Sequence, residues 1–208
     1  MKISNKLLSD SCGRNAALAM QCVCYLIIFI MILCLILSCM GRQTFVLHGD
    51  GEVQERAIYA EDDHDKHPRN LTVHSGDDIH VWTNEENQID ILTQVGLSLM
   101  YAVHTIPAII AYWLLSRVFS NVYKGRIFVE RNAHDLLGFA VLQFVIALGV
   151  PVIKFLVRWI INLISSSPIS ISTGQDMLQT IFWGIGFLAA AYIIQKGIPR
   201  NVEEAEVL

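Results

Sequence analysis

Residues 16–40 read AALAMQCVCYLIIFIMILCLILSCM, without one charged side chain. The stretch lies within 27 consecutive uncharged residues that Arg14 and Arg42 bracket. About 20 apolar residues in a helix cross a bilayer core, whereas the apolar region of a cleavable signal has only about 7–15 residues. The stretch therefore predicts a membrane-spanning helix that stays in the chain.

Three further apolar stretches predict spans at 91–116, 136–160 and 177–195, and the second of these three ends in an extension along the membrane interface. The composition agrees, because 53% of the 208 residues are hydrophobic and 16% are charged, against about 25% charged in a soluble domain. These numbers exclude a soluble enzyme, a secreted disulfide scaffold and an isolated nucleic-acid module, and we expect no nucleic-acid partner.

Lys and Arg near the span ends predict the orientation of the chain, because cytoplasmic loops carry an excess of both. One side of the membrane has nine of them and the other has six. We expect a bacterial inner-membrane protein with both termini in the cytoplasm. The segments between spans are a cytoplasmic N-terminus (1–15), an outer segment (41–90), a basic cytoplasmic loop (117–135), an outer loop (161–176) and a cytoplasmic tail (196–208).

The outer segment carries most of the acidic charge, with twelve Asp or Glu against four Lys or Arg in residues 42–90. Strand-like runs at 44–48 and 53–59 flank Gly49-Asp50-Gly51, which predicts a hairpin, and 71–74 with 79–83 predict a second hairpin. The expected fold is thus an all-α bundle of four transmembrane helices, N-in and C-in, with a small extracytoplasmic β-hairpin cap. The acidic residues that we expect to bind a basic protein partner are Asp62, Asp63 and Asp65.

Five of the seven histidines lie in this outer segment. Imidazoles beside carboxylates suit Zn²⁺ or Ni²⁺, and the candidate ligands are His64, His67, His74 and His80. The same histidines could instead sense pH or be ordinary surface residues. Apart from such a metal we expect no cofactor.

Three basic or titratable side chains lie within or near the spans. Lys154 and Arg158 are four residues apart and share a helix face, where they anchor at the outer headgroups or bind an anionic lipid or an acidic partner. His104 is one turn before Pro107, inside the second span. Its imidazole either bonds Gln143 or a carbonyl freed by Pro107, or it takes part in proton or ligand chemistry.

The stretch after Val122 carries a family resemblance. The frame Gly125-x-x-Phe128-x-x-x-Asn132-x-x-x-Leu136 before an apolar helix resembles small bacterial four-span proteins of the domain of unknown function 2975 family. The resemblance covers residues 91–208 and implies a cytoplasmic frame, no catalytic residues and a link to regulation. From the residues themselves, Gly125 permits a turn, Phe128 packs at the interface and Asn132 caps the next helix.

No nucleophile–base pair is evident in the spans, so we expect a protein that is not an enzyme. The first hypothesis is a membrane protein that binds a protein partner, for instance an immunity protein against a membrane-targeted toxin. The alternatives are a sensor or regulator that reads metal or pH, and a small transporter or channel subunit around His104. The lipid bilayer is the other expected partner, and the sequence also allows a homo-oligomer.

Overall fold

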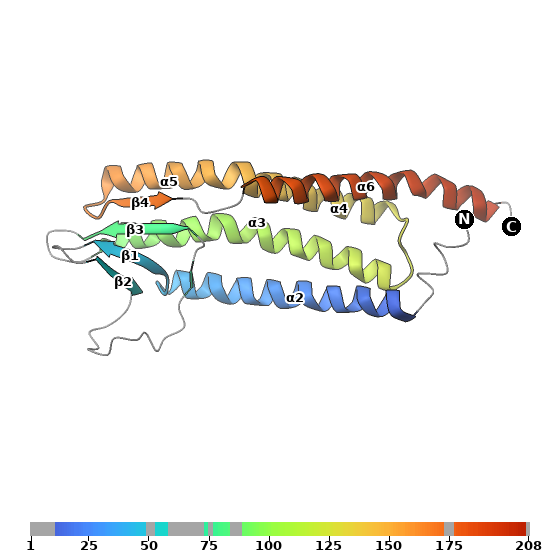
Figure 1. Ribbon diagram of the computed structural model, residues 1–208, viewed down its shortest axis with the longest axis horizontal. Coiled ribbons are helices and arrows are strands. Elements are labelled where there is room, and N and C mark those ends of the chain that lie inside the picture. The colour runs from blue at the N-terminus through green and yellow to red at the C-terminus, as the bar shows by residue number, and fades with distance from the viewer. Residues whose placement is uncertain are drawn as a thin grey trace. The chain divides into compact units, whose positions relative to one another are not determined.

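The structure is a computed structural model that describes residues 11–48, 53–57, 73–74, 77–83, 89–172 and 177–206. It contains four helices that are long and apolar enough to cross a membrane (Figure 1). These helices are Gly13–Cys39, Ile91–Tyr123, Glu130–Ile164 and Met177–Ile198. The prediction of a mostly helical chain with four such helices is confirmed.

The helices are longer than the predicted spans. Their bounds are α2 (Ser11–Cys39), α3 (Ile91–Tyr123), α4 (Glu130–Phe144), α5 (Val150–Ile164) and α6 (Met177–Glu206). Both flanking helices extend into the predicted loop at 117–135, because only residues 124–129 lie between α3 and α4. Helix backbone groups bond one another, so a helix can continue past the apolar span into its charged flanks. For the same reason α6 continues through most of the predicted tail at 196–208.

A π-helical turn, η1 (Val145–Gly149), joins α4 to α5 without a break in the helical run. Pro151 follows it in the first turn of α5. Proline lacks an N–H group and its ring crowds the carbonyl one turn earlier, and a π turn is one way in which a helix accommodates such a mismatch. The turn thus lies where the sequence removes a backbone donor.

The chain forms two compact units. Unit 1 comprises Met1–Ile30, Pro107–Ala147 and Met177–Leu208, and unit 2 comprises Met31–Ile106 and Leu148–Asp176. In unit 1, α4 and α6 pack along each other, and the rings of Phe139 and Phe187 meet edge to face with centroids 4.4 Å apart. The buried core of unit 1 comprises Cys24, Ala111, Leu115, Val118, Leu136, Phe139 and Ala191.

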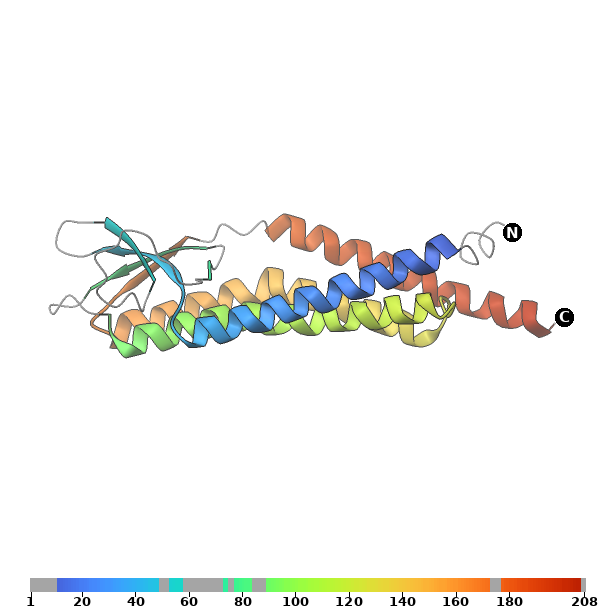
Figure 2. The same cartoon turned by 90° about the horizontal axis from the view of Figure 1, so that it is seen from below.

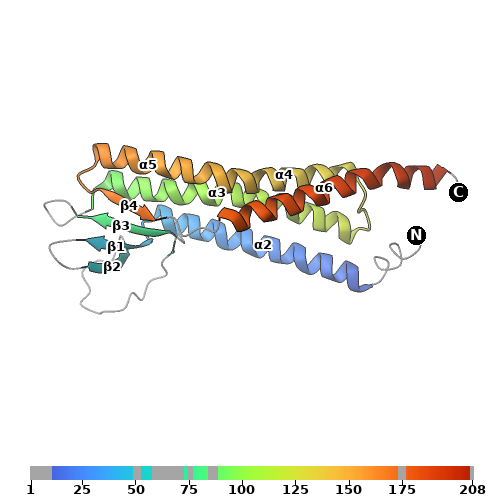
Figure 3. The ribbon, with the colours of Figure 1, turned by 45° about the horizontal axis from the view of Figure 1, so that its top comes forward.

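Unit 2 contains a four-stranded sheet in the order β2-β1-β3-β4 (Figure 3). The strands are β1 (Thr44–His48), β2 (Val53–Ala57), β3 (Asp78–Trp82) and β4 (Ile169–Ser172). β1 pairs antiparallel with β2 in the register Thr44↔Ala57, which is the predicted first hairpin. β3 pairs parallel with β1 and antiparallel with β4.

The predicted second hairpin is wrong. Val73 makes only an isolated bridge with Gln43, and its backbone N–H and C=O bond Arg42 and Thr44 rather than β3. β3 takes its antiparallel neighbour from β4, within the predicted loop 161–176. Strand β4 suits this place because Ile169 and Ile171 alternate with serines and so present an apolar face to the core.

One face of the sheet lies on α3 and α5 (Figure 2). The shared core of unit 2 comprises Phe45, Leu47, Ile79, Val81 and Ile169 from the sheet, Leu97 and Met100 from α3, and Ile161 from α5. The close approach of the two helices needs a glycine: a Cβ on Gly96 would lie 2.1 Å from Cδ1 of Ile161. The sheet is thereby held on the helices by a continuous apolar core.

Candidate functional site

A buried ion pair joins the sheet to the helices within unit 2. The Lys154 ammonium on α5 donates to the Asp77 carboxylate, which directly precedes β3. The two side chains are only 8% and 4% exposed. Removing two charges from water is costly unless they are paired and hydrogen-bonded, so the loss of either side chain would leave the other as an uncompensated buried charge.

The pair lines a small cavity together with Tyr101 and His104 of α3. The cavity has a volume of about 20 Å³, and a cavity of about 10–15 Å³ already holds one water molecule. Its remaining walls are apolar, formed by Ile79, Leu97, Met100 and Ile171. Four titratable side chains from three segments thus surround the space of one water.

We call this arrangement the Asp77–Lys154 site. Its carboxylate, ammonium, imidazole and phenol groups offer both hydrogen-bond donors and acceptors to the cavity. Buried titratable groups at a cavity are candidates for function. The site is also structural, because the ion pair connects a sheet segment to α5.

The expectation that Lys154 anchors at the headgroups is wrong. Its side chain turns toward the sheet because Asp77 provides a countercharge there. Arg158, one turn further along α5, is half-buried, whereas Phe155 and Trp159, which directly follow the two basic residues, are exposed. The two basic residues therefore share a helix face, as the spacing predicted, but that face is directed away from the exposed apolar side.

His104 is half-buried at the cavity, and Gln143 is half-buried on α4. Gln143 lies against α6, where its Cβ is 3.5 Å from the position of a Cβ on Gly184. The charges that face His104 across the cavity are those of Asp77 and Lys154. His104 therefore belongs to a polar cluster that its position in the apolar span did not reveal.

The histidines of the sheet lie on the face opposite the core. His48 and His80 share a hydrogen bond of 2.8 Å between Nε2 and Nδ1, and the His48 ring also stacks on Trp82. His74 bonds the Thr44 hydroxyl instead, at 3.2 Å. Among the described residues no group of three His, Cys, Asp or Glu could hold a metal ion. His64 and His67, and the acidic Asp62, Asp63 and Asp65, lie outside the described residues.

The α3–α4 turn contains the frame Gly125, Phe128, Asn132 and Leu136. Gly125 has a φ of 75°, a left-handed conformation that favours glycine. Asn132 is fully buried and donates to the carbonyls of Arg126 and Ile127 at 2.8 and 2.9 Å. The cap prediction is wrong, because the N-cap is Val129, without a side-chain bond. Asn132 closes the turn from inside the helix instead.

The other two frame residues pack in unit 1. Leu136 is buried in the core. Phe128 lies against α6, where a Cβ on Gly197 would approach its ring to 2.5 Å. A glycine at 197 is thus needed for the ring to lie there, which links the turn to the last helix.

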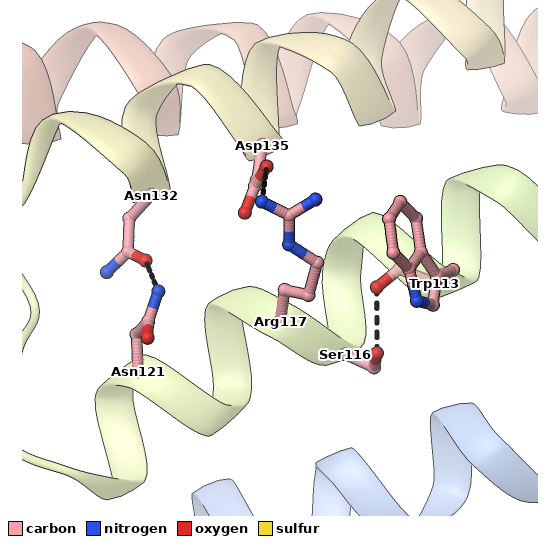
Figure 4. A network of polar contacts seen from close by, with 6 residues as sticks. All are labelled: Trp113, Ser116, Arg117, Asn121, Asn132 and Asp135. Carbon is pink, nitrogen blue, oxygen red and sulfur yellow. Dashed lines mark hydrogen bonds and ion pairs between the residues drawn. The ribbon is translucent and has the colours of Figure 1, made fainter.

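A polar network connects α3 and α4 beside this turn (Figure 4). Asn121 donates to Asn132 at 2.7 Å, and Arg117 pairs with the buried Asp135 at 3.2 Å. The Arg117 guanidinium also lies 4.8 Å from the centre of the Trp113 ring. Among the described residues, Nε of Arg117 and Oδ2 of Asp135 have no hydrogen-bond partner. The network fixes the helix pair.

Sequence periodicity could have identified Asp77 and Asp135. Asp77, Ile79 and Val81 alternate along the chain, so Asp77 shares the inward face of β3. Asp135 lies three residues after Asn132 and one before Leu136 on the buried face of α4. A carboxylate on a buried face requires a basic partner. The position of these two aspartates in an apolar pattern was therefore a signal of buried ion pairs.

Hydrogen bonds join the start of α3 to the end of α5 in unit 2. The Asp90 carboxylate accepts from the Ser165 hydroxyl at 2.9 Å, and the buried Thr93 hydroxyl donates to the Ser167 carbonyl at 2.8 Å. The Ser165 bond, followed by the Leu92 backbone N–H, lowers the pKa of Asp90 because both stabilise the ionised form.

Comparison with protein-family models finds no match, and searches of curated proteins and of solved structures find none either.

Proposed function

We propose that this chain is a multi-pass protein of the bacterial inner membrane that binds a protein partner through its extracytoplasmic sheet and is not an enzyme. The distribution of Lys and Arg supports cytoplasmic termini and an outer sheet. The resemblance of residues 91–208 to the domain of unknown function 2975 family supports the same orientation of the α3–α4 turn.

The observation that carries the proposal is the way in which the sheet is fastened. The apolar core of unit 2 and the buried Lys154–Asp77 pair both hold the sheet on the helices. A sheet that is fixed in this way loses little conformational entropy when it binds. It therefore suits recognition of another protein.

The two edges of the sheet differ. The side-chain amide of Asn162 bonds both the N–H and the C=O of Ile169 in β4, at 2.8 and 3.0 Å. These groups point away from β3, because the neighbouring Pro168 carbonyl is the one that bonds Trp82. Asn162 thus occupies the outer edge of β4 as a partner strand would.

The other edge is β2, which has no second neighbouring strand among the described residues. The chain continues from β2 into the acidic stretch with Asp62, Asp63 and Asp65. A partner with an extended, basic segment matches such an edge, since backbone pairing supplies affinity and opposite charge speeds encounter. A membrane-targeted toxin neutralised by this chain is one concrete form of that partner.

Site-specific photocrosslinking in cells tests the proposal. A photoreactive residue in place of Gln54 on β2 should capture a discrete protein, whereas the same residue in place of Ser172 on β4 should capture little. The captured protein is then identified by mass spectrometry. Equal capture from both edges, or capture of lipid alone, would refute recognition at β2.

A sensor or regulator is the second candidate, and the His48–His80 pair is the observation that favours it. One ring must donate and the other accept, so two protonated rings would place donor against donor. The same two nitrogens are also potential metal ligands. Titration calorimetry of the full chain in detergent with Zn²⁺ or Ni²⁺ should give heat that His80→Gln abolishes. Identical heats from both proteins would remove this candidate.

A further inference from the structure

A groove runs between α4 and α6 in unit 1. Its volume is about 630 Å³, which is within the range of small-molecule binding sites. Most of its lining is apolar and comprises Ala133 and Leu137 of α4 with Ile185, Leu188, Ala189 and Ala191 of α6. The alanines leave room between the two helices, so the groove is built by the choice of small residues on facing turns.

The polar lining residues gather at one end of the groove. α4 and α6 run antiparallel, because Phe128 meets Gly197 near one end while Phe144 meets Gly184 near the other. Glu130 and His134 at the start of α4 therefore lie at the same end as the later residues of α6. Those later residues are Tyr192 and Gln195, which also line the groove.

Opposite charges flank this polar end. The Glu130 carboxylate on α4 is exposed and lines the groove. The Lys196 ammonium on α6 lies 5.8 Å from the centre of the Tyr192 ring, which lines the groove from the other side. The ion pairs among the described residues include neither charge. The mouth of the groove thus offers one negative and one positive group from different helices.

The length of the groove matches one leaflet of a bilayer. Ile185 and Gln195 mark its two ends on α6, and ten helical residues rise about 15 Å. Half of a hydrocarbon core that is about 30 Å thick is the same length. An acyl chain of a lipid in one leaflet would therefore run from the polar end to the apolar end.

We infer that this groove binds one phospholipid with a zwitterionic, amine-bearing headgroup, of the phosphatidylethanolamine class. One acyl chain lies along Leu137 and Leu188, Lys196 binds the phosphate and Glu130 binds the ammonium. The inference is independent of the protein partner, because it concerns unit 1 and the sheet belongs to unit 2.

Native mass spectrometry tests the lipid site. The full chain is reconstituted in vesicles of equal parts phosphatidylethanolamine and phosphatidylglycerol, extracted in mild detergent, and its retained lipid is identified. We expect one retained phosphatidylethanolamine, roughly fivefold enriched over phosphatidylglycerol, as a single exposed charge pair allows. Glu130→Gln should bring this ratio to about one, because it removes the ammonium partner.

Filling the groove provides the second arm. Leu188→Trp should abolish lipid retention, whereas Leu178→Trp, on an exposed part of α6 outside the groove, should leave it unchanged. Thermal unfolding in the same detergent checks that both variants are folded. Enrichment of phosphatidylglycerol, equal retention of both lipids, or retention unaffected by Leu188→Trp would overturn the inference. The inference would also be overturned if a polypeptide co-purified with the chain and Leu188→Trp displaced it.

Discussion

Replacement of Lys154 by methionine tests the Asp77–Lys154 site most severely. Methionine keeps the apolar stem of the side chain but leaves the Asp77 carboxylate, 4% exposed, without its countercharge. Breaking a buried pair by removing one partner costs about 3–5 kcal/mol, whereas replacing both partners by apolar residues is about neutral. A loss of that size lowers the melting temperature of a chain of this length by about 6–20 °C.

The assay is thermal unfolding of the purified chain in detergent. Lys154→Met should lower the melting temperature strongly, and the addition of Asp77→Leu should restore most of it, because the cavity walls are otherwise apolar. Arg158→Met is the matched control, since Arg158 lies one turn away and is only half-buried. A loss below about 1 kcal/mol for Lys154→Met, as for exposed pairs, or no recovery in the double variant, would refute the buried pair.

Three further tests address other parts of the fold. Asn132→Ala leaves two turn carbonyls without their donor and should destabilise the chain by about 3 kcal/mol in the same unfolding assay; a loss below about 0.5 kcal/mol would contradict the closure of the turn. Gly96→Ala should destabilise the chain by about 1–3 kcal/mol through overpacking. Gly186→Ala should stabilise it by up to about 1 kcal/mol, because a Cβ at residue 186 would have no atom within 4 Å. A stabilising Gly96→Ala with a destabilising Gly186→Ala would show that the helices approach each other differently. Because the pKa of Asp90 is lowered in the folded chain, the ionised carboxylate stabilises the fold at pH values above the ordinary pKa of 3.8, and this stabilisation is lost as pH falls through the folded pKa. Ser165→Ala should raise the pKa of Asp90 in an NMR titration of labelled aspartate. An unchanged titration would argue against the Ser165–Asp90 hydrogen bond.

The sequence predicted the elements that local rules determine. The four long apolar runs predicted four helices able to span a membrane, because bilayer thickness sets their length. The sequence Gly49-Asp50-Gly51 between two short strand-like runs predicted the first hairpin, since neighbouring segments pair with little loss of entropy. Gly125 was predicted to permit a turn, and its left-handed φ confirms that the turn needs a conformation that favours glycine.

Long-range pairings were missed. Strand β4 comes from residues 169–172 and pairs with β3, which lies far earlier in the chain, and no local pattern specifies which strand it joins. The headgroup anchoring that the sequence predicts for Lys154 is wrong because its partner Asp77 resembles a solvated residue beside the exposed Asp78. Only the alternation with Ile79 and Val81 distinguishes the two carboxylates. The Asp77–Lys154 site could therefore not be predicted from the sequence. Each of its two charged residues, taken alone, is compatible with a position at the protein surface.

Labelling of single cysteines with a membrane-impermeant maleimide tests the central claim, which is that four spans place the sheet and its acidic stretch on the extracytoplasmic side of the membrane. In a background without the native cysteines, Asp63→Cys should react in intact cells, and Leu208→Cys should react only after the membrane is permeabilised. Reaction of the C-terminal cysteine in intact cells, with residue 63 protected, would contradict both the orientation and the proposed binding of an outer partner.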